Sequence, residues 1–61
     1  MPVVTIRMAN GRTLEQKQIL AAEITAAITR TLGVDPERVI LFFEELDTEN
    51  IARAGTLVSE S

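Results

Sequence analysis

Residues 1–6 read Met1-Pro2-Val3-Val4-Thr5-Ile6, a proline followed by an apolar and mostly β-branched run. β-Branched residues favour extended backbone, and proline is tolerated at the first residue of a strand, where no ladder hydrogen bond is required of it. We therefore predict a strand over Val3–Met8, with Pro2 at its start. Asn10-Gly11 is a turn signal that ends this strand, and Arg12 follows the turn directly.

The second residue also bears on chemistry. A small residue such as Pro2 generally allows the initiator methionine to be removed, which would leave a free secondary amine at the tip of the strand. An ordinary α-amino group titrates near about 8, and burial lowers that pKa because it disfavours the charged form. A prolyl amine in an apolar pocket is then a usable base at neutral pH. The alternative is that Met-Pro is a common start with no functional meaning.

A long helix is predicted from Thr13 to about Leu32. Thr13 and Gln16 fit the two ends of a capping box, Gly33 is placed to end the helix, and Pro36 prevents it from resuming. One apolar stripe recurs at spacings of three and four: Leu20, Ile24, Ala27, Ile28, Thr31 and Leu32. Four polar side chains fall largely on the other side of the helix and are interpreted as a solvated face without function: Gln16, Lys17, Glu23 and Arg30.

The second strand is predicted over Arg38–Glu44. Its apolar residues do not alternate with polar ones, which indicates burial on both faces. A strand, a helix and a second strand form a βαβ unit with parallel strands and a right-handed crossover. One helix covers only one face of a sheet, and a two-stranded sheet is rarely stable alone. The uncovered face and edges are therefore expected to meet other copies of the chain.

The predicted fold class is α+β, with a parallel strand pair, one long helix and a C-terminal segment, in a single domain over residues 1–61. Residues 51–58 in that segment form either a short hairpin or an arm that lies on a neighbouring copy. A chain of 61 residues buries only about 60% of its unfolded surface, although 46% of its residues are apolar. Without Cys or His, disulfides are excluded and a structural zinc site is implausible. Self-association is the remaining source of stability.

Charge and composition exclude several classes of function. A net charge of −3 argues against nucleic acid and anionic membranes as partners. No apolar stretch reaches the roughly 18 residues of a membrane span, and no signal-peptide pattern is present, so a cytoplasmic location is expected.

Cys, His and Tyr are absent, and Lys17 is the only lysine. If the chain is an enzyme, its proton-transfer group must be a carboxylate, Lys17 or the amine of Pro2. Glu44 and Glu45 are more simply interpreted as strand-end solvation than as an acid–base pair.

Several segments together resemble the 4-oxalocrotonate tautomerase family over essentially the whole chain. They are Pro2, Asn10-Gly11-Arg12, Glu15-Gln16-Lys17 at the start of a helix, and an apolar second strand ending in Glu. The resemblance implies dimers with a shared four-stranded sheet, usually assembled as a hexameric trimer of dimers. It also implies that Pro2 is the general base, which takes a proton from the 2-hydroxyl of a 2-hydroxydienoate and returns it to a carbon further along the conjugated system. Neither a cofactor nor a metal is implied.

The resemblance also assigns roles to other residues. Arg12 corresponds to an arginine that holds a substrate carboxylate, a role suited to the guanidinium fork. Ile40 stands where well-studied members carry a second arginine that polarises the 2-oxo or 2-hydroxy end of the substrate, and Ile51 stands where they carry an aromatic residue. Ile40 and Ile51 are therefore expected as apolar pocket walls. Arg53 either replaces the missing cation or lies at a subunit contact, and Arg38 is expected on the same side of its strand as Ile40.

Three functions follow from these residues. The first is a tautomerase that acts on a small carboxylate. The second is one subunit of a heterohexameric tautomerase that needs a sister chain. The third is a non-catalytic assembly protein of the same fold, in which Pro2→Ala would change nothing but stability.

Overall fold

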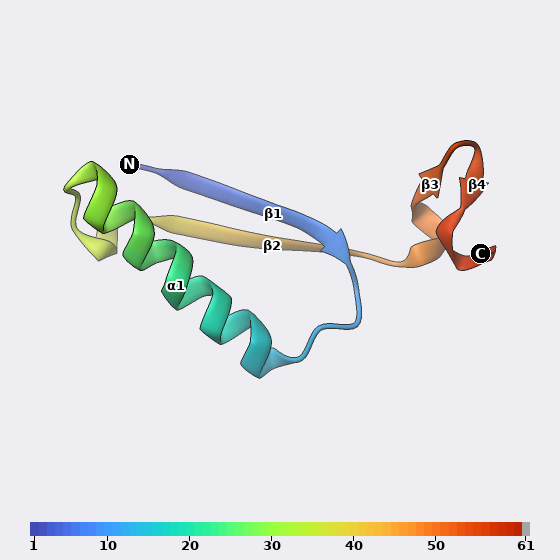
Figure 1. Cartoon of the computed structure of the whole chain (residues 1–61), viewed down its shortest axis with the longest axis horizontal. Helices are drawn as coiled ribbons and strands as arrows, with labels where there is room; N and C mark the ends of the chain where they lie inside the picture. Colours follow the sequence, from blue (N-terminus) through green and yellow to red (C-terminus); the bar gives the residue numbers. More distant parts are fainter. Residues whose placement is uncertain (61) are drawn as a thin grey trace.

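The computed structural model describes residues 1–60, and it forms the predicted βαβ unit followed by a small hairpin (Figure 1). The elements of the unit are β1 (Val3–Ala9), α1 (Leu14–Leu32) and β2 (Ile40–Leu46). β1 and β2 pair in parallel, from Val3 opposite Ile40 to Ala9 opposite Leu46. The hairpin pairs β3 (Ala52–Arg53) with β4 (Thr56–Leu57) in antiparallel fashion. The predicted fold class is confirmed.

Helix α1 begins and ends where its capping residues predict. The Thr13 Oγ1 accepts a 3.1 Å hydrogen bond from the Gln16 amide, and the Gln16 Oε1 accepts a 3.0 Å bond from the Thr13 amide. Gly33 has a φ of 69° and donates its N–H to the Thr29 carbonyl at 3.0 Å. Only glycine adopts this left-handed conformation without a steric cost. Within residues 1–60, no helix is long and apolar enough to cross a membrane.

The predicted bounds of the second strand are wrong by two residues. The prediction was Arg38–Glu44, whereas the strand runs over Ile40–Leu46. The cause is the 3-10 turn η1 (Pro36–Arg38), which Pro36 opens because its fixed φ suits a first helical position. The Arg38 amide donates to the Asp35 carbonyl at 3.0 Å, so Arg38 lies in a turn and is not on the strand beside Ile40.

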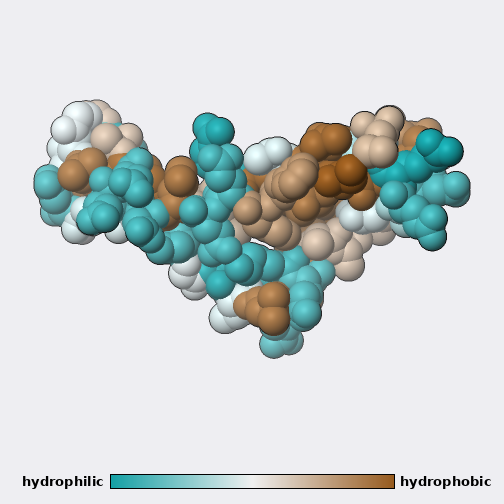
Figure 2. Space-filling view, turned by 180° about the vertical axis from the view of Figure 1, so that it is seen from behind, coloured by the Kyte–Doolittle hydropathy of each residue, from teal (hydrophilic) through white to brown (hydrophobic). Residues whose placement is uncertain are grey.

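The sheet has one covered face and one open face. Residues that face α1 are half-buried, whereas Val3, Ile40 and Phe42 on the opposite face are 58%, 37% and 55% exposed. The prediction that β2 is buried on both faces is therefore wrong for the single chain. Leu20 and Leu32 of the predicted helical stripe are exposed as well. Figure 2 shows apolar side chains gathered over one half of the molecule, without cover.

The single chain has no closed core. Among residues 1–60 no side chain is buried, and the accessible surface is 4755 Å². A compact monomer of 6.7 kDa would expose about 3900 Å². The excess surface includes the open sheet face, which the chain itself leaves uncovered.

Residues after β2 leave the body of the molecule and extend along its long axis (Figure 1). This C-terminal arm comprises residues 47–60: the 3-10 turn η2 (Thr48–Asn50), the hairpin β3–β4 and the 3-10 turn η3 (Val58–Glu60). The two hairpin-turn residues, Ala54 and Gly55, both have positive φ, as tight two-residue hairpins prefer. The hairpin alternative for residues 51–58 is thus confirmed, and residue 61 lies outside the described part of the chain.

Candidate functional site

Pro2 lies immediately before β1 and is tied to β2 by the backbone. Its carbonyl oxygen accepts a 3.0 Å hydrogen bond from the Ile40 amide, which extends the parallel ladder by one contact beyond the Val3–Ile40 pair. Pro2 is half-buried, whereas Met1 is 78% exposed. The structure therefore places the backbone of Pro2 beside that of Ile40 and leaves Met1 accessible.

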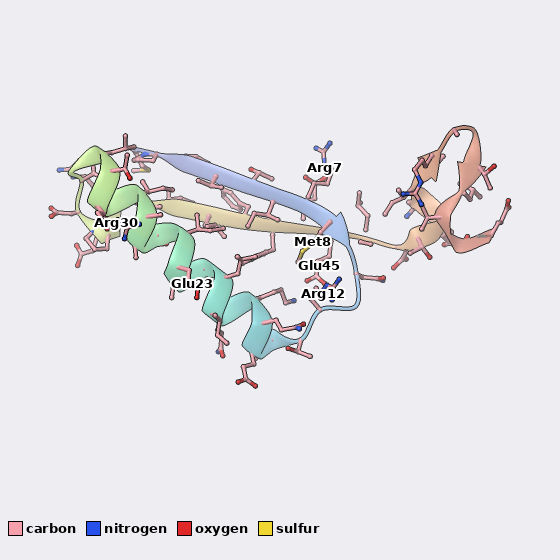
Figure 3. All side chains as sticks on the ribbon, viewed as in Figure 1. Arg7, Met8, Arg12, Glu23, Arg30 and Glu45 are labelled. Atoms are coloured by element: carbon pink, nitrogen blue, oxygen red, sulfur yellow. The ribbon has the colours of Figure 1, made fainter. Side chains whose placement is uncertain are left out.

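Arg12 lies at the other end of β1. It follows the last strand residue in the loop before α1, and Figure 3 shows it beside Met8 and Glu45, away from the N-terminus. The seven residues of β1 rise about 3.3 Å each, so the strand alone separates Pro2 from Arg12 by roughly 23 Å. Arg12 and Pro2 of one chain cannot contact the same small substrate.

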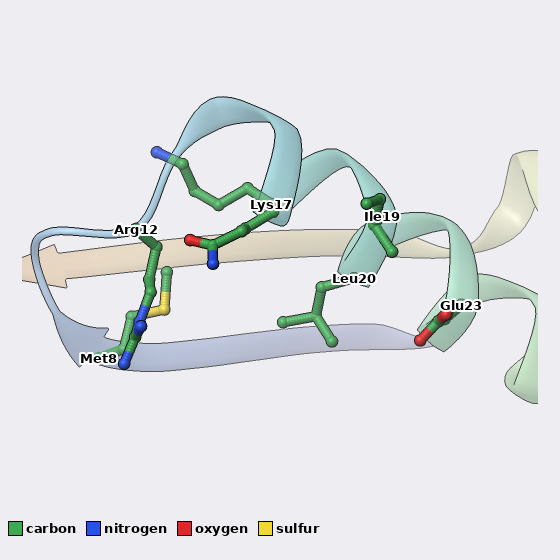
Figure 4. A pocket seen from close by; sticks show the side chains of 7 residues that line it. Met8, Arg12, Lys17, Ile19, Leu20 and Glu23 are labelled. Carbon is green, nitrogen blue, oxygen red and sulfur yellow. The ribbon is translucent and has the colours of Figure 1, made fainter.

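The Arg12 side chain borders an open groove of about 400 Å³ between β1 and α1. The groove is lined by Met8, Arg12, Gln16, Lys17, Ile19, Leu20 and Glu23. In Figure 4 the Arg12 and Met8 side chains lie together at one end of it, with Leu20 and Ile19 further along the helix. Within residues 1–60 the Arg12 guanidinium makes no ion pair or side-chain hydrogen bond. An arginine in this state is free to receive a carboxylate from elsewhere.

Ile51 and Arg53 lie in the C-terminal arm. The Ile51 amide donates to the Thr48 carbonyl at 3.3 Å, and the Ile51 carbonyl accepts a 2.8 Å bond from the Val58 amide. Arg53 pairs with Thr56 in the hairpin, is exposed, and has no ion-pair partner in the described part of the chain. Both residues follow the carboxyl end of β2, so they lie at the Arg12 end of the molecule.

The expected site residues thus form two groups at opposite ends of the β1–β2 sheet of one chain. Pro2 and Ile40 lie where the strands begin, whereas Arg12, Ile51 and Arg53 lie beyond the point where the strands end. A site that uses residues from both groups has to be assembled from more than one copy.

The sequence did not reveal two sets of contacts that hold the structure near Arg12, an ion pair and the hydrogen bonds of Asn10. Lys17 was assigned to the solvated face and Glu45 to strand-end solvation, but the Lys17 Nζ and the Glu45 Oε1 form a 2.5 Å ion pair. Both side chains are less than a third exposed. That Lys17 is the only lysine of the chain was the one available signal. A second ion pair, Arg7–Glu44 at 3.3 Å, lies on the open sheet face and is too exposed to contribute much.

The second set of contacts is made by Asn10. Its backbone amide donates to the Leu46 carbonyl at 2.9 Å, and its side-chain Nδ2 donates to the Asp47 Oδ1 at 2.5 Å. Gly11 follows with a φ of 117°, a conformation that favours glycine. The loop that carries Arg12 is therefore fixed at its start to the end of β2. No group of three or more acidic side chains that could hold a metal ion occurs within residues 1–60.

Known proteins similar to this chain match it over nearly its full length. A family model described as "Tautomerase enzyme" matches residues 2–61. The 2-hydroxymuconate tautomerase of Bacillus subtilis is 40% identical over 60 residues, which cover 98% of this chain and 97% of that protein. The solved structure of YwhB, a homologue of 4-oxalocrotonate tautomerase, superposes with a TM-score of 0.92 at 38% identity, covering 98% of both chains. A heterohexameric 4-oxalocrotonate tautomerase from Chloroflexus aurantiacus superposes with a TM-score of 0.90 at 30% identity, covering 98% of this chain and 97% of that one.

Proposed function

This chain belongs to the tautomerase enzyme family, and we propose that it is a 4-oxalocrotonate tautomerase-like isomerase whose base is the amine of Pro2 after removal of Met1. The observation that carries this proposal is the place of Pro2, half-buried at the start of the sheet and held beside Ile40. The chain offers no Cys, His or Tyr as an alternative group for near-neutral proton transfer.

The proposed reaction shifts one proton and consumes no co-reactant. The neutral amine of Pro2 removes the 2-hydroxyl proton of an enol or dienol 2-hydroxy acid, and the O–H electrons form the 2-oxo group. The double bond electrons move along the conjugated system, and the prolinium returns the proton to a carbon at its far end. The conjugated carboxylate spreads the transient charge, so the reaction requires neither a cofactor nor a metal. The proposed location of the enzyme is the cytoplasm.

We place Arg12 in the same site as Pro2, but from a second copy. β1 has a free edge in the described chain, because its partner in the sheet is β2 alone. Antiparallel pairing of two β1 strands about a two-fold axis would give a four-stranded sheet and bring the Arg12 end of one copy to the Pro2 end of the other. Arg12 would then hold the substrate carboxylate while Pro2 transfers the proton.

The same assembly would give the Pro2 pocket its apolar walls and its second positive charge. Ile40 would form an apolar wall directly beside Pro2, which excludes water and favours the neutral amine. Ile51 would close the pocket from the arm of another copy. Arg53 has no ion-pair partner in the described chain and would supply the second cation that residue 40 does not. A monocarboxylate enol is then as suitable a substrate as the dicarboxylate 2-hydroxymuconate.

One observation favours a second candidate, a subunit of a heterohexamer. Ile40 leaves the surroundings of Pro2 without a cation from β2, and the relative from Chloroflexus aurantiacus assembles as a heterohexamer. A sister chain would then supply the missing arginine. This candidate predicts poor activity for the chain alone and recovery when the product of a neighbouring gene is added.

The test is an ultraviolet assay of 2-hydroxymuconate and phenylenolpyruvate with the wild type and Pro2→Ala, alongside an intact mass. The proposal expects Met1 to be absent, turnover of at least one substrate, and loss of that turnover in Pro2→Ala. A retained Met1 would block the amine and contradict the mechanism. Equal turnover by the two proteins would contradict Pro2 as the base, and no turnover by either protein, with Met1 absent, would favour the heterohexamer subunit or the non-catalytic assembly protein.

A further inference from the structure

The loop that presents Arg12 is short and is held at both ends. At its start, the Asn10 amide continues the ladder to the Leu46 carbonyl at 2.9 Å. At its end, the Thr13 side chain and amide are both engaged by Gln16 in the capping box. Gly11 and Arg12 between these points have no side-chain partner within residues 1–60. The direction of Arg12 is thus set by the residues on either side of it.

A single side-chain hydrogen bond in the described chain connects this loop to the C-terminal arm. It joins the Nδ2 of Asn10 to the Oδ1 of Asp47 at 2.5 Å, across 37 positions of sequence. Asp47 is the N-cap residue of η2, so it stands where the arm leaves β2. The arm carries Ile51 and Arg53, and the loop carries Arg12. The bond therefore links the two segments that would enter the Pro2 site of another copy.

We infer that Asn10 and Asp47 are positioning residues, which hold the Arg12 loop and the arm in one fixed arrangement. The contact is called the Asn10–Asp47 latch below. The inference rests on the proposed function, because its purpose is to aim Arg12 at a substrate carboxylate. The latch is a hydrogen bond to a charged acceptor, stronger than a neutral one, although its exposure to solvent reduces its effect. The expected consequence is a change in substrate binding and not in the proton transfer itself.

The latch can be broken by one substitution and rebuilt by a second that exchanges the positions of the amide and the carboxylate. Asn10→Asp sets two carboxylates against each other and opens the contact. Adding Asp47→Asn to that variant restores an amide donor and a carboxylate acceptor with exchanged positions. Asp47→Ala removes the latch without adding charge near Arg12. Asn50→Asp is the matched control, because Asn50 is the only other asparagine, is exposed, and contacts Asp47 only through its backbone amide, which donates to the Asp47 carbonyl at 2.8 Å and is kept in the variant.

The kinetic readout separates positioning from simple damage. Asn10→Asp and Asp47→Ala should raise KM about three- to tenfold with little change in kcat, because binding of a remote carboxylate is weakened in ground and transition state alike. The exchanged pair should return KM close to the wild-type value, and Asn50→Asp should leave it unchanged. An exchanged pair that stays as weak as Asn10→Asp would mean that the charge at residue 10 acts on Arg12 directly, which would overturn the latch.

A readout independent of turnover keeps the inference apart from the proposed function. The protection factor of the residue 10 backbone amide, which donates to the Leu46 carbonyl at 2.9 Å, should fall in Asn10→Asp and Asp47→Ala and be restored in the exchanged pair. Unchanged exchange in all variants would overturn the latch even if the wild type is active. An inactive wild type with the expected exchange pattern would contradict the proposed function and leave the latch standing.

Discussion

The Ile40 amide donates a 3.0 Å hydrogen bond to the Pro2 carbonyl, so the candidate base and residue 40 are adjacent in the sheet. The bond places the backbones of the two residues side by side, and the proposed function makes the side chain of residue 40 part of the Pro2 pocket. An isoleucine there favours a neutral amine but provides no positive charge for an oxyanion. The identity of residue 40 is therefore expected to determine which substrates the site accepts.

Ile40→Arg should increase kcat/KM for 2-hydroxymuconate by roughly tenfold or more, because a preorganised cation stabilises charge that develops at the 2-oxo end. Steady-state assays with this substrate measure the effect. Ile40→Met is the control, since it keeps the size and the apolar character and should give no gain. A loss of activity in Ile40→Arg while the assembly stays intact would show that a cation at residue 40 is unfavourable.

Phe42→Asp should dissociate the assembly, because Phe42 is 55% exposed on the open face of the sheet in the single chain. Light scattering after size exclusion should show a smaller particle, and the thermal midpoint should fall and depend less on protein concentration. Ser59→Asp adds the same charge at an exposed position of the arm and serves as the control. An unchanged mass in Phe42→Asp would mean that this face stays uncovered.

Gly33→Ala should destabilise the protein by about 1 kcal/mol, because residue 33 has a φ of 69° and an added Cβ disfavours that conformation. A Cβ at this position would meet no atom within 4 Å, so the cost arises from the backbone alone. Gly33→Asn should retain most of the stability, since asparagine tolerates left-handed backbone. Urea unfolding at fixed protein concentration measures both, and equal losses in the two variants would contradict the backbone explanation.

Local signals in the sequence predicted the elements well. Thr13, Gln16 and Gly33 set the ends of α1 as expected, because caps act through backbone groups next to them in sequence. The start of β2 was misplaced because the 3-10 turn that Pro36 opens takes up residues that also have a strand-like pattern. The apolar run in β2 was interpreted as doubly buried, since sequence does not distinguish burial by the same chain from burial by another copy.

The candidate site was predicted as a set of residues but not as an arrangement. Its resemblance to known tautomerases gave Pro2 and Arg12 their roles, yet nothing in the spacing of two residues tells whether they meet within one chain. The length of β1 shows that Pro2 and Arg12 lie too far apart to meet within one chain. The Lys17–Glu45 pair and the Asn10–Asp47 latch were missed because each joins residues far apart in sequence.

The central claim is that Pro2 of one copy works with Arg12 of another, and subunit complementation tests it most directly. Pro2→Ala and Arg12→Ala are each expected to be nearly inactive when refolded alone. Equal amounts unfolded together and refolded should recover about a quarter of wild-type activity, because half of the dimers pair unlike chains and each of these has one complete site of two. No recovery, with mixed assemblies shown to form by mass spectrometry, would contradict a site shared between copies.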